Sequence, residues 1–366
     1  MLIQGKHYHT IWENTRGEVQ IIDQRFLPFE LKTPQLKNAE DTFKAIEEMW
    51  VRGAPLIGVT AAYGMYLEAK ENKGMEMPKL KAHLKETAEK LLAARPTAIN
   101  LKHAIDRCLQ QLTAEPFESG TNLAQQLLEV ARALKNQEIE NSRKIGWHGV
   151  KLIEKIAKKK KGPVNILTHC NAGWLACIDY GTAIAPIYEA QKRGIAIHVW
   201  VDETRPRNQG ARLTLFELEE QGISCSLIAD NTGGLLMQKG MVDLCIVGSD
   251  RTAANGDVAN KIGTYLKALA AKDNGIPFYV ALPESSFDLS LKNGGEIPIE
   301  ERSEEEVTHL EGLVDNKIKK LRITTENARV KNYGFDVTPA HLVTKLITEK
   351  GICTPNEQEI RKTLEK

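Results

Sequence analysis

Five short apolar runs in the second half of the chain constrain its fold more than any other feature. They are rich in Val, Ile and aromatic residues and lack regular polar alternation, which is typical of strands buried on both faces of a parallel sheet. The runs span residues 164–170, 195–203, 223–230, 243–250 and 276–284. Amphipathic segments between them predict helices, at 174–192, 211–221 and 258–272. This alternation of strand and helix predicts a doubly wound α/β domain.

Each of the five runs ends in polar residues that can take part in chemistry. The endings read "THCN", "DETR", "ADNT", "GSDR" and "PESS". In a parallel sheet the carboxyl ends of the strands lie at one edge, and open α/β sheets bind ligands outside that edge. The sequence therefore predicts a functional site there.

The first part of the chain is predicted to be mainly helical after a small β element. Residues 17–28 can pair with the preceding "HTIWEN", and helical spacing follows from residue 38 to residue 145. The "KKKK" run at 158–161 indicates a solvated helix end with Gly162 as its C-cap. Since 366 residues exceed one ordinary core, we predict two domains, a small-β plus helical domain at 1–161 and a doubly wound domain at 162–366.

Charge and hydropathy exclude several functional classes. Lys plus Arg (49) nearly equals Asp plus Glu (48), so a general nucleic-acid-binding or membrane-surface role has no support. The N-terminus lacks the apolar core of a signal peptide, and no apolar run approaches the roughly 20 residues that span a bilayer. We expect a cytoplasmic protein with no membrane segment.

The cysteines favour free thiols over a metal site. They stand at 108, 170, 177, 225, 245 and 353, and none forms a C-x-x-C pair. We expect no structural zinc, no catalytic metal and no cofactor.

Cys170 in "THCNAG" is the first candidate for chemistry. It is expected at a strand end just before a helix N-terminus, which would lower the pKa of its thiol and favour a base or nucleophile. The alternative is a small buried hydrophobic residue, and spacing alone leaves the two interpretations balanced. Cys177 is predicted to pack in the core and His169 to act as a hydrogen-bonding support.

Asp250 in "GSDRTAANGDVANKIGT" is the second candidate, since it ends another strand at the same edge. A carboxyl beside an apolar pocket can have a raised pKa and serve as a general acid. The alternative is a salt bridge to Arg251. Asn260 and Lys261 are expected to open the next helix, where a lysine and backbone N–H groups suit a phosphate.

The loop "VDETRPRNQGARLT" carries further polar candidates. Asp202 and Glu203 are either a general-acid pair or, by preference, anchors for Arg205 or Arg212. Gln209, just before the helix, can offer an amide to an anionic ligand.

Arg52 and Arg95 each stand beside proline or glycine at a helix break. They can reach across a domain cleft to phosphate oxygens, although each taken singly is more simply a surface arginine. The chain has no G-x-G-x-x-G after a first strand, no G-x-x-x-x-G-K-[ST] and no G-x-S-x-G, which weakens dehydrogenase, NTPase and α/β-hydrolase hypotheses.

Taken together, these segments resemble the methylthioribose-1-phosphate isomerases of the methionine salvage pathway. The matching stretches run in the family's order from near residue 50 to near residue 351: "VRGAPLIG", "ARPTAINL", "LTHCNAG", "VDETRPRNQGARLT", "IADNTGG", "GSDRTAANGDVANKIGTYLKALAA", "IPFYVALP" and "NYGFDVTPAHLVTKLITEKGI". The resemblance implies a mainly helical N-terminal domain, a Rossmann-like C-terminal domain and a homodimer.

The resemblance also implies roles for individual residues. Cys170 and Asp250 correspond to the family's catalytic pair. The implied phosphate and substrate contacts are Arg52, Gly53, Ala54, Arg95, Gln209, Asn260 and Lys261. The implied reaction converts 5-methylthioribose 1-phosphate to 5-methylthioribulose 1-phosphate, a small-molecule isomerisation that needs neither metal nor cofactor.

Small departures from the family pattern bear on the substrate's non-phosphate end. They are "GSD" for "GAD", "NQG" for "LQG", and Trp174 after "CNAG", of which the last two are expected near the pocket. Relatives of the same fold isomerise 5-deoxyribose 1-phosphate or ribose 1,5-bisphosphate. Others are non-catalytic regulatory subunits of the translation-initiation exchange factor, which would lack the Cys170 and Asp250 motifs. The presence of both motifs favours an enzyme.

Overall fold

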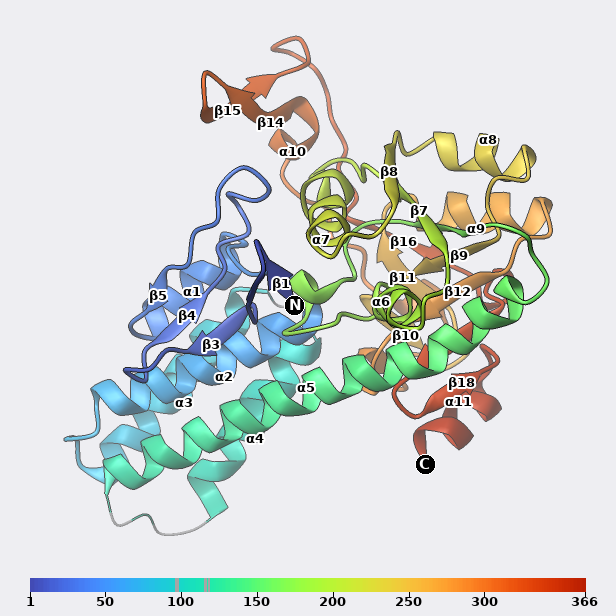
Figure 1. Ribbon diagram of the computed structural model, residues 1–366. Helices are drawn as coiled ribbons and strands as arrows, with labels where there is room; N and C mark the ends of the chain where they lie inside the picture. Colours follow the sequence, from blue (N-terminus) through green and yellow to red (C-terminus); the bar gives the residue numbers. More distant parts are fainter. Residues whose placement is uncertain (96–98, 115–116, 118) are drawn as a thin grey trace.

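The N-terminal half of the protein is a small β element followed by five helices. The computed structural model describes residues 1–95, 99–114, 117 and 119–366 (Figure 1). The strands are β1 (Leu2–Ile3), β2 (Lys6–His7), β3 (Ile11–Glu13), β4 (Val19–Ile21) and β5 (Gln35–Leu36). The helices are α1 (Ala39–Glu47), α2 (Ala54–Glu71), α3 (Met77–Ala93), α4 (Ile99–Ala114) and α5 (Gly120–Ala157). The predicted pairing of "HTIWEN" with residues 17–28 is confirmed by the antiparallel β3–β4 ladder.

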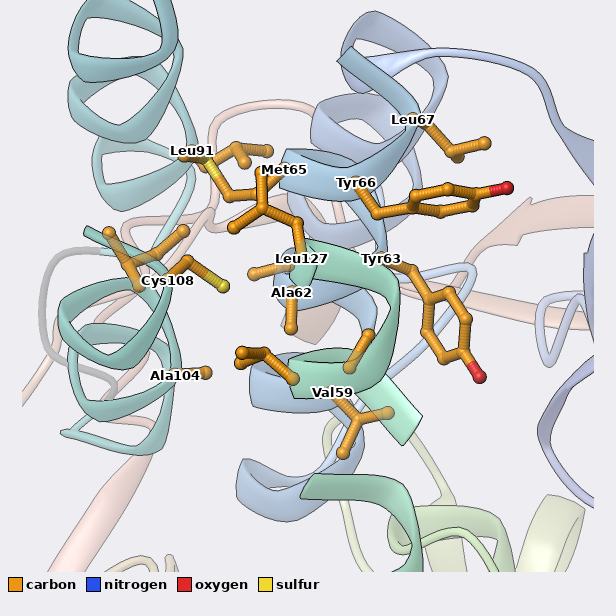
Figure 2. Packing of buried hydrophobic residues seen from close by; sticks show 14 of the residues in the cluster. Val59, Ala62, Tyr63, Met65, Tyr66, Leu67, Leu91, Ala104, Cys108 and Leu127 are labelled. Carbon is orange, nitrogen blue, oxygen red and sulfur yellow. The ribbon is translucent and has the colours of Figure 1, made fainter. Parts of the chain in front are cut away.

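Helix α2 is the centre of the N-terminal region because it is apolar on nearly every face. It contacts α1, α3, α4 and α5. Figure 2 shows Met65 and Ala62 of α2 packed toward Cys108 of α4 and Leu127 of α5. A helix that is hydrophobic all round must be buried, and the surrounding helices meet that requirement.

Helix α5 joins this region to the rest of the molecule. Its first half packs in the cluster around α2, whereas Ile145 and Val150 pack in the cluster beside the large sheet. The helix ends at Ala157, with Lys158 as its C-cap. The expectation that Gly162 is the C-cap is therefore wrong; Gly162, at φ +93°, lies in the turn before the next strand. The division of the chain at residues 161 and 162 stays a prediction.

The C-terminal half is built on a seven-stranded sheet with the order β18-β17-β12-β9-β6-β7-β8. All neighbours are parallel except the edge strand β18. The strands are β6 (Val164–Thr168), β7 (Ile197–Asp202), β8 (Cys225–Ile228), β9 (Leu244–Val247), β12 (Phe278–Ala281), β17 (Lys345–Thr348) and β18 (Gly351–Cys353). The first five parallel strands are the five predicted runs, so the doubly wound, Rossmann-like fold is confirmed.

The strand order contains a topological switch point between β6 and β9. The chain proceeds from β6 outward to β7 and β8, then returns to the other side of β6 as β9 and continues outward to β12 and β17. The loops after β6 and β9 therefore diverge and leave a crevice, which is where doubly wound sheets bind ligands.

Helices cover both faces of the sheet (Figure 1). They are α6 (Ala185–Lys192), α7 (Leu215–Glu220), α8 (Thr232–Gln238), α9 (Thr264–Asp273) and α11 (Glu357–Leu364). None of the helices in the described part of the chain is long and apolar enough to cross a membrane.

Two predicted helices begin later than their local patterns indicate. The segment 174–192 contains a single 3₁₀ turn, Trp174–Ala176, and α6 begins only at Ala185. Residues Val258–Lys261 form strand β11, because they pair with β10 (Arg251–Ala253) and β16 (Phe335–Thr338), and α9 begins at Thr264. Pairing with a distant strand overrides the local helical pattern, since sheet hydrogen bonds come from outside the segment.

A second, smaller sheet is formed by strands that follow β9 in the chain. Its order is β13 (Phe287–Asp288), β10, β11 and β16. The chain between β13 and β16 forms an arm with α10 (Glu305–Thr308) and the hairpin of β14 (His309–Val314) and β15 (Lys317–Arg322), which projects from the body (Figure 1).

Candidate active site

A cleft with about 1260 Å³ of empty space, open mouth included, lies outside the switch point. All nine residues predicted for the site line it. They are Arg52, Gly53, Ala54, Arg95, Cys170, Gln209, Asp250, Asn260 and Lys261. The structure thus brings together residues that come from the start of α2, the chain after α3, the loops after β6, β7 and β9, and strand β11.

Cys170 occupies a strained backbone position two residues after β6. Its φ is +65°, in the left-handed region that residues with a Cβ atom rarely adopt. Two threonines hold it there, since its N–H donates to Thr204 Oγ1 (2.9 Å) and its carbonyl accepts from Thr214 Oγ1 (2.6 Å). Such strain costs about 1–3 kcal/mol and concentrates at functional sites.

The predicted lowering of the Cys170 pKa is wrong. No long helix begins behind this thiol, only the Trp174–Ala176 turn, so the expected helix dipole is missing. Burial raises the pKa of Cys170, and the nearby Arg52 and Lys261 offset part of that increase. At neutral pH the free protein therefore carries a thiol at this position.

Asp250 follows β9 and lies across the switch point from Cys170. Its side chain faces the open cleft, but the walls of the cleft enclose the carboxyl on its other sides. The resulting desolvation raises the pKa of the carboxyl, and the nearby Lys261 and Arg52 offset part of that increase. Its backbone N–H donates to the carbonyl of Ala259 on β11 (3.0 Å). Arg251, the alternative partner for Asp250, lies 3.5 Å from Asp288.

Arg52 and Lys261 place two positive charges in the cleft with only neutral oxygen acceptors. Arg52 donates to Asn171 through its side-chain Oδ1 (2.5 Å) and its carbonyl (2.9 Å). Lys261 Nζ donates to the carbonyl of Gly334 (2.9 Å). Within the described ranges, neither cation has a carboxylate at ion-pair distance. Both charges are available to an anionic ligand.

The expectation that Asn260 and Lys261 open a helix is wrong, because both lie on strand β11. The helix N-terminus at the cleft belongs to α2 instead. Its N-cap is Gly53, at φ +89°, and a Cβ atom there would lie 2.1 Å from the carbonyl oxygen of Ala176. Only glycine allows this approach, which places Ala54 and the first turn of α2 in the cleft wall.

The remaining predicted residues present polar atoms with differing partners. Gln209 is buried, and its Oε1 has no hydrogen-bond partner among the residues that the structure describes. Asn260 Nδ2 donates to Thr264 Oγ1 (3.1 Å). Arg95 lies 3.7 Å from Glu300 and is largely buried, which lowers its pKa. An unpartnered buried amide oxygen is suited to a ligand hydroxyl.

Comparison with known proteins identifies the family. Residues 50–355 match the Initiation factor 2 subunit family. Methylthioribose-1-phosphate isomerase from Sulfurimonas denitrificans is 54 % identical, covering 98 % of this chain and 99 % of that protein, and the one from Rhizobium meliloti is 53 % identical, covering 99 % and 98 %. The chain belongs to the methylthioribose-1-phosphate isomerase family.

Solved structures agree with this family assignment. The 5-methylthioribose 1-phosphate isomerase from Pyrococcus horikoshii OT3 superposes with a TM-score of 0.86 at 37 % identity, covering 98 % of this chain and 96 % of that one. The A. fulgidus protein described as translation initiation factor eIF-2B, subunit delta, gives 0.83 at 38 %, covering 98 % and 100 %. The isomerase family thus shares its fold with proteins described as translation factors, so the fold does not define the chemistry.

Sequence reasoning missed several residues that line the cleft of this family member. Arg302 and Arg207 both pair with Glu306, at 2.8 and 2.9 Å, and Arg302 also pairs with Glu300 at 3.0 Å. Arg302 was missed because "EERSEEE" has the pattern of a solvated charged segment, whereas Arg207 lies in the loop "VDETRPRNQGARLT" and no pattern set it apart from the other arginines there. Six large apolar side chains also line the cleft, and their sequence pattern alone does not distinguish them from core residues: Met49, Ile57, Ile99, Ile297, Ile299 and Phe335.

The predicted supporting role of His169 is confirmed. Its Nδ1 lies 2.8 Å from Asp202 Oδ2 and its Nε2 lies 2.9 Å from the carbonyl of Ile262, so it ties the end of β6 to the end of β7 and to the residue after β11. Asp202 also pairs with Lys267 (3.2 Å). Asp202 is therefore neither a cleft acid nor an arginine anchor.

Two further details of the prediction are resolved by packing. Cys177 is buried, and that burial raises the pKa of its thiol well above the usual range, as expected of a core cysteine. Trp174 is fully buried, and Asn208 stands between the lining residues Arg207 and Gln209. These two departures from the family pattern therefore lie near the pocket, as expected, but neither lines it.

Two side-chain groups of the described chain have the composition of metal ligands. One contains His169, Asp202 and Asp230, but Lys267 Nζ already supplies the positive charge there. The other contains His7, His9 and Asp179, at the N-terminal hairpin. Neither gathers its carboxylates in the cleft.

Proposed function

We propose that this protein isomerises 5-methylthioribose 1-phosphate to 5-methylthioribulose 1-phosphate. The observation that carries the proposal is the meeting, at one switch point, of a thiol, a carboxyl, and two cations that have no carboxylate at ion-pair distance among the described residues. The relatives of 51–54 % identity bear the name of this enzyme.

The two cations and the start of α2 are suited to the phosphate. Arg52 uses two of its five N–H donors on Asn171 and keeps the others for a ligand. Lys261 contributes a second charge, and the first turn of α2 contributes backbone N–H groups with partial positive charge. A phosphate dianion would then neutralise both cations.

Asp250 is suited to opening the sugar ring. The phosphate on the anomeric carbon prevents spontaneous opening to an aldehyde, so the ring oxygen must be protonated while the ring C–O bond breaks. A carboxyl whose pKa is raised remains protonated at higher pH than an exposed aspartate and can donate that proton.

Hydrogen must then move from C2 to C1, and Cys170 stands beside this step. Either its thiolate removes the C2 proton to give an enediol, or hydride shifts directly in a desolvated pocket while Cys170 stabilises the charge. The raised pKa of Cys170 favours the second route, because the resting side chain is a thiol and not a base.

The apolar part of the cleft supports a substrate with an apolar C5 substituent. Six large apolar side chains line the cleft, and Arg207 and Arg302 are already neutralised by carboxylates. A second phosphate, as in ribose 1,5-bisphosphate, would lack free counter-charges there. The methylthio group, which 5-deoxyribose 1-phosphate lacks, contributes only about 1–3 kcal/mol to binding in an apolar pocket. We therefore expect measurable turnover of 5-deoxyribose 1-phosphate.

The test is a ketose assay with all three sugar phosphates. We expect kcat/KM to be highest for 5-methylthioribose 1-phosphate, lower for 5-deoxyribose 1-phosphate and lowest for ribose 1,5-bisphosphate. No ketose from any of the three would contradict an enzymatic function and favour a regulatory subunit.

We also propose that the protein is a cytoplasmic homodimer, as its family resemblance implies. Exposed apolar side chains of α8 and α9, Leu235, Leu266 and Leu269, offer a surface of the kind that subunits cover. A monomer mass by light scattering at micromolar concentration would contradict the dimer.

A further inference from the structure

Glu217 of α7 is a fully buried carboxylate that belongs to no part of the mechanism above. Its Oε1 accepts from the N–H of Leu175 (2.8 Å) and from Asn171 Nδ2 (2.9 Å). Its Oε2 accepts from the N–H of Trp174 (3.1 Å) and from the hydroxyl of Tyr188 (3.0 Å). Burying a charge is costly unless all its lone pairs are satisfied, and here four donors surround one carboxylate.

The chain around Glu217 is built to admit it. A Cβ atom on Gly173 would lie 1.7 Å from Glu217 Oε2, so only glycine leaves room for the carboxylate. Glu217 also fixes the 174–176 turn, whose Ala176 carbonyl packs against Gly53 in the cleft wall. The carboxylate itself does not line the cleft.

Asn171 connects Glu217 to the cleft, and its orientation is dictated by its partners. Thr214 uses its single hydroxyl proton on the carbonyl of Cys170, so its oxygen must accept from Asn171 Nδ2 (3.1 Å). Glu217 accepts from the same amide nitrogen. Both amide protons are therefore consumed on this side, and Oδ1 must face Arg52, which donates to it.

We infer that Glu217 is a positioning residue that acts through Asn171 to aim the Arg52 guanidinium at the substrate phosphate. The inference rests on the proposed function, because it takes Arg52 as a phosphate ligand. If Glu217 is replaced by a residue that cannot accept from Asn171, the amide is free to rotate and present N–H groups to Arg52. The guanidinium then loses one of its two fixed acceptors.

The experiment compares Glu217→Met with Tyr188→Phe, using untagged full-length protein and calorimetric titration with inorganic phosphate. Methionine keeps the length of the side chain and has no oxygen to accept from Asn171. Burial raises the pKa of Glu217 to about 7, so titrations at pH 8.5 keep the wild-type carboxylate ionised. Tyr188→Phe removes a donor from the other oxygen of the same carboxylate and leaves Asn171 untouched, which makes it the matched control.

We expect Glu217→Met to weaken phosphate binding by ~10-fold, the effect of one charge-assisted hydrogen bond. KM should rise to a similar degree while kcat changes less. Tyr188→Phe should lower the melting temperature and leave phosphate affinity within about twofold. In an Arg52→Met background, Glu217→Met should weaken phosphate binding no further.

Equal loss of phosphate affinity in Glu217→Met and Tyr188→Phe would overturn the inference in favour of a merely structural role. If Arg52→Met weakens phosphate binding and Glu217→Met does not, the inference fails while the proposed function stands. If Arg52→Met binds phosphate as tightly as the wild type, the proposed phosphate site itself fails. Should Glu217→Met not fold, Asn171→Ala must give the ~10-fold loss, and unchanged affinity in that variant overturns the inference.

Discussion

The helical cluster around α2 and the cleft at the switch point are both largely buried, but they are built on opposite principles. Around α2, apolar side chains such as Met65, Leu91 and Leu127 fill the space between four helices (Figure 2). In the cleft, a strained cysteine, an unpartnered amide oxygen and cations held by neutral oxygens stand close together. The cluster is arranged for stability, whereas the cleft leaves polar groups and cations facing a space that the proposed function assigns to an anionic substrate.

This difference separates two kinds of mutational effect. In the cluster, truncation leaves a cavity and lowers the free energy of unfolding. In the cleft, removal of a polar group that has no protein partner leaves the fold intact and removes a contact to the ligand. The predictions below test whether the two regions can be damaged independently.

The largest expected effect is loss of turnover in the cleft. Asp250→Asn should lower kcat by ~10²–10⁴-fold, as loss of a general acid does, and Cys170→Ser by ~10²–10³-fold, as loss of a charge-stabilising group does, with melting temperatures close to that of the wild type. Turnover of 5-methylthioribose 1-phosphate and thermal unfolding are measured on the same samples. Near-normal kcat in either variant would remove that residue from the catalytic pair.

The converse effect is expected in the helical cluster. Leu127→Ala should lower the free energy of unfolding by ~2–5 kcal/mol, because Leu127 is fully buried and its truncation leaves a cavity. At 20 °C, where the protein remains folded, kcat and KM should match the wild type. Denaturant titration and steady-state kinetics measure the two. A fall in kcat comparable to that of Asp250→Asn would show that the two regions are coupled.

A smaller effect is expected for the phosphate contact. Lys261→Met keeps the length of the side chain and removes its charge, so phosphate affinity should fall by ~10–100-fold, the range for a hydrogen bond to a charged group. Lys239→Met, at an exposed position after α8, is the control and should bind as the wild type does. Equal affinity in Lys261→Met and its control would contradict the phosphate role.

The smallest effect concerns pH and the arm beside the cleft. Arg302 and Arg207 lower the pKa of Glu306 from 4.5 to about 2, so its stabilising contribution is complete above pH 4.5 and is lost as pH falls toward 2. Glu306→Gln should lower the free energy of unfolding by ~1–3 kcal/mol at pH 7. Unfolding curves of Glu306→Gln and wild type should converge between pH 4.5 and 2. A constant difference across that range would contradict the linkage.

Much of the fold could be predicted because its signals are local. The five apolar runs became the first five parallel strands, and their polar endings led to Cys170 and Asp250 at one edge. Where prediction failed, the deciding partner was distant. Residues Val258–Lys261 became a strand because residues 335–338 pair with them. Arg302 entered the cleft from a segment with the pattern of a solvated loop.

By itself, the sequence determined the order of the first five parallel strands, the residue types at each strand end, and the family to which their motifs belong. Only the tertiary structure decided the direction in which the pKa of Cys170 is shifted, because desolvation depends on what packs around the thiol and not on its neighbours in sequence. It also decided that Arg52 and Lys261 share the cleft with no carboxylate at ion-pair distance among the described residues, and that Glu217 accepts from Asn171. These are contacts between segments far apart in the chain, and charge and burial are set by such contacts.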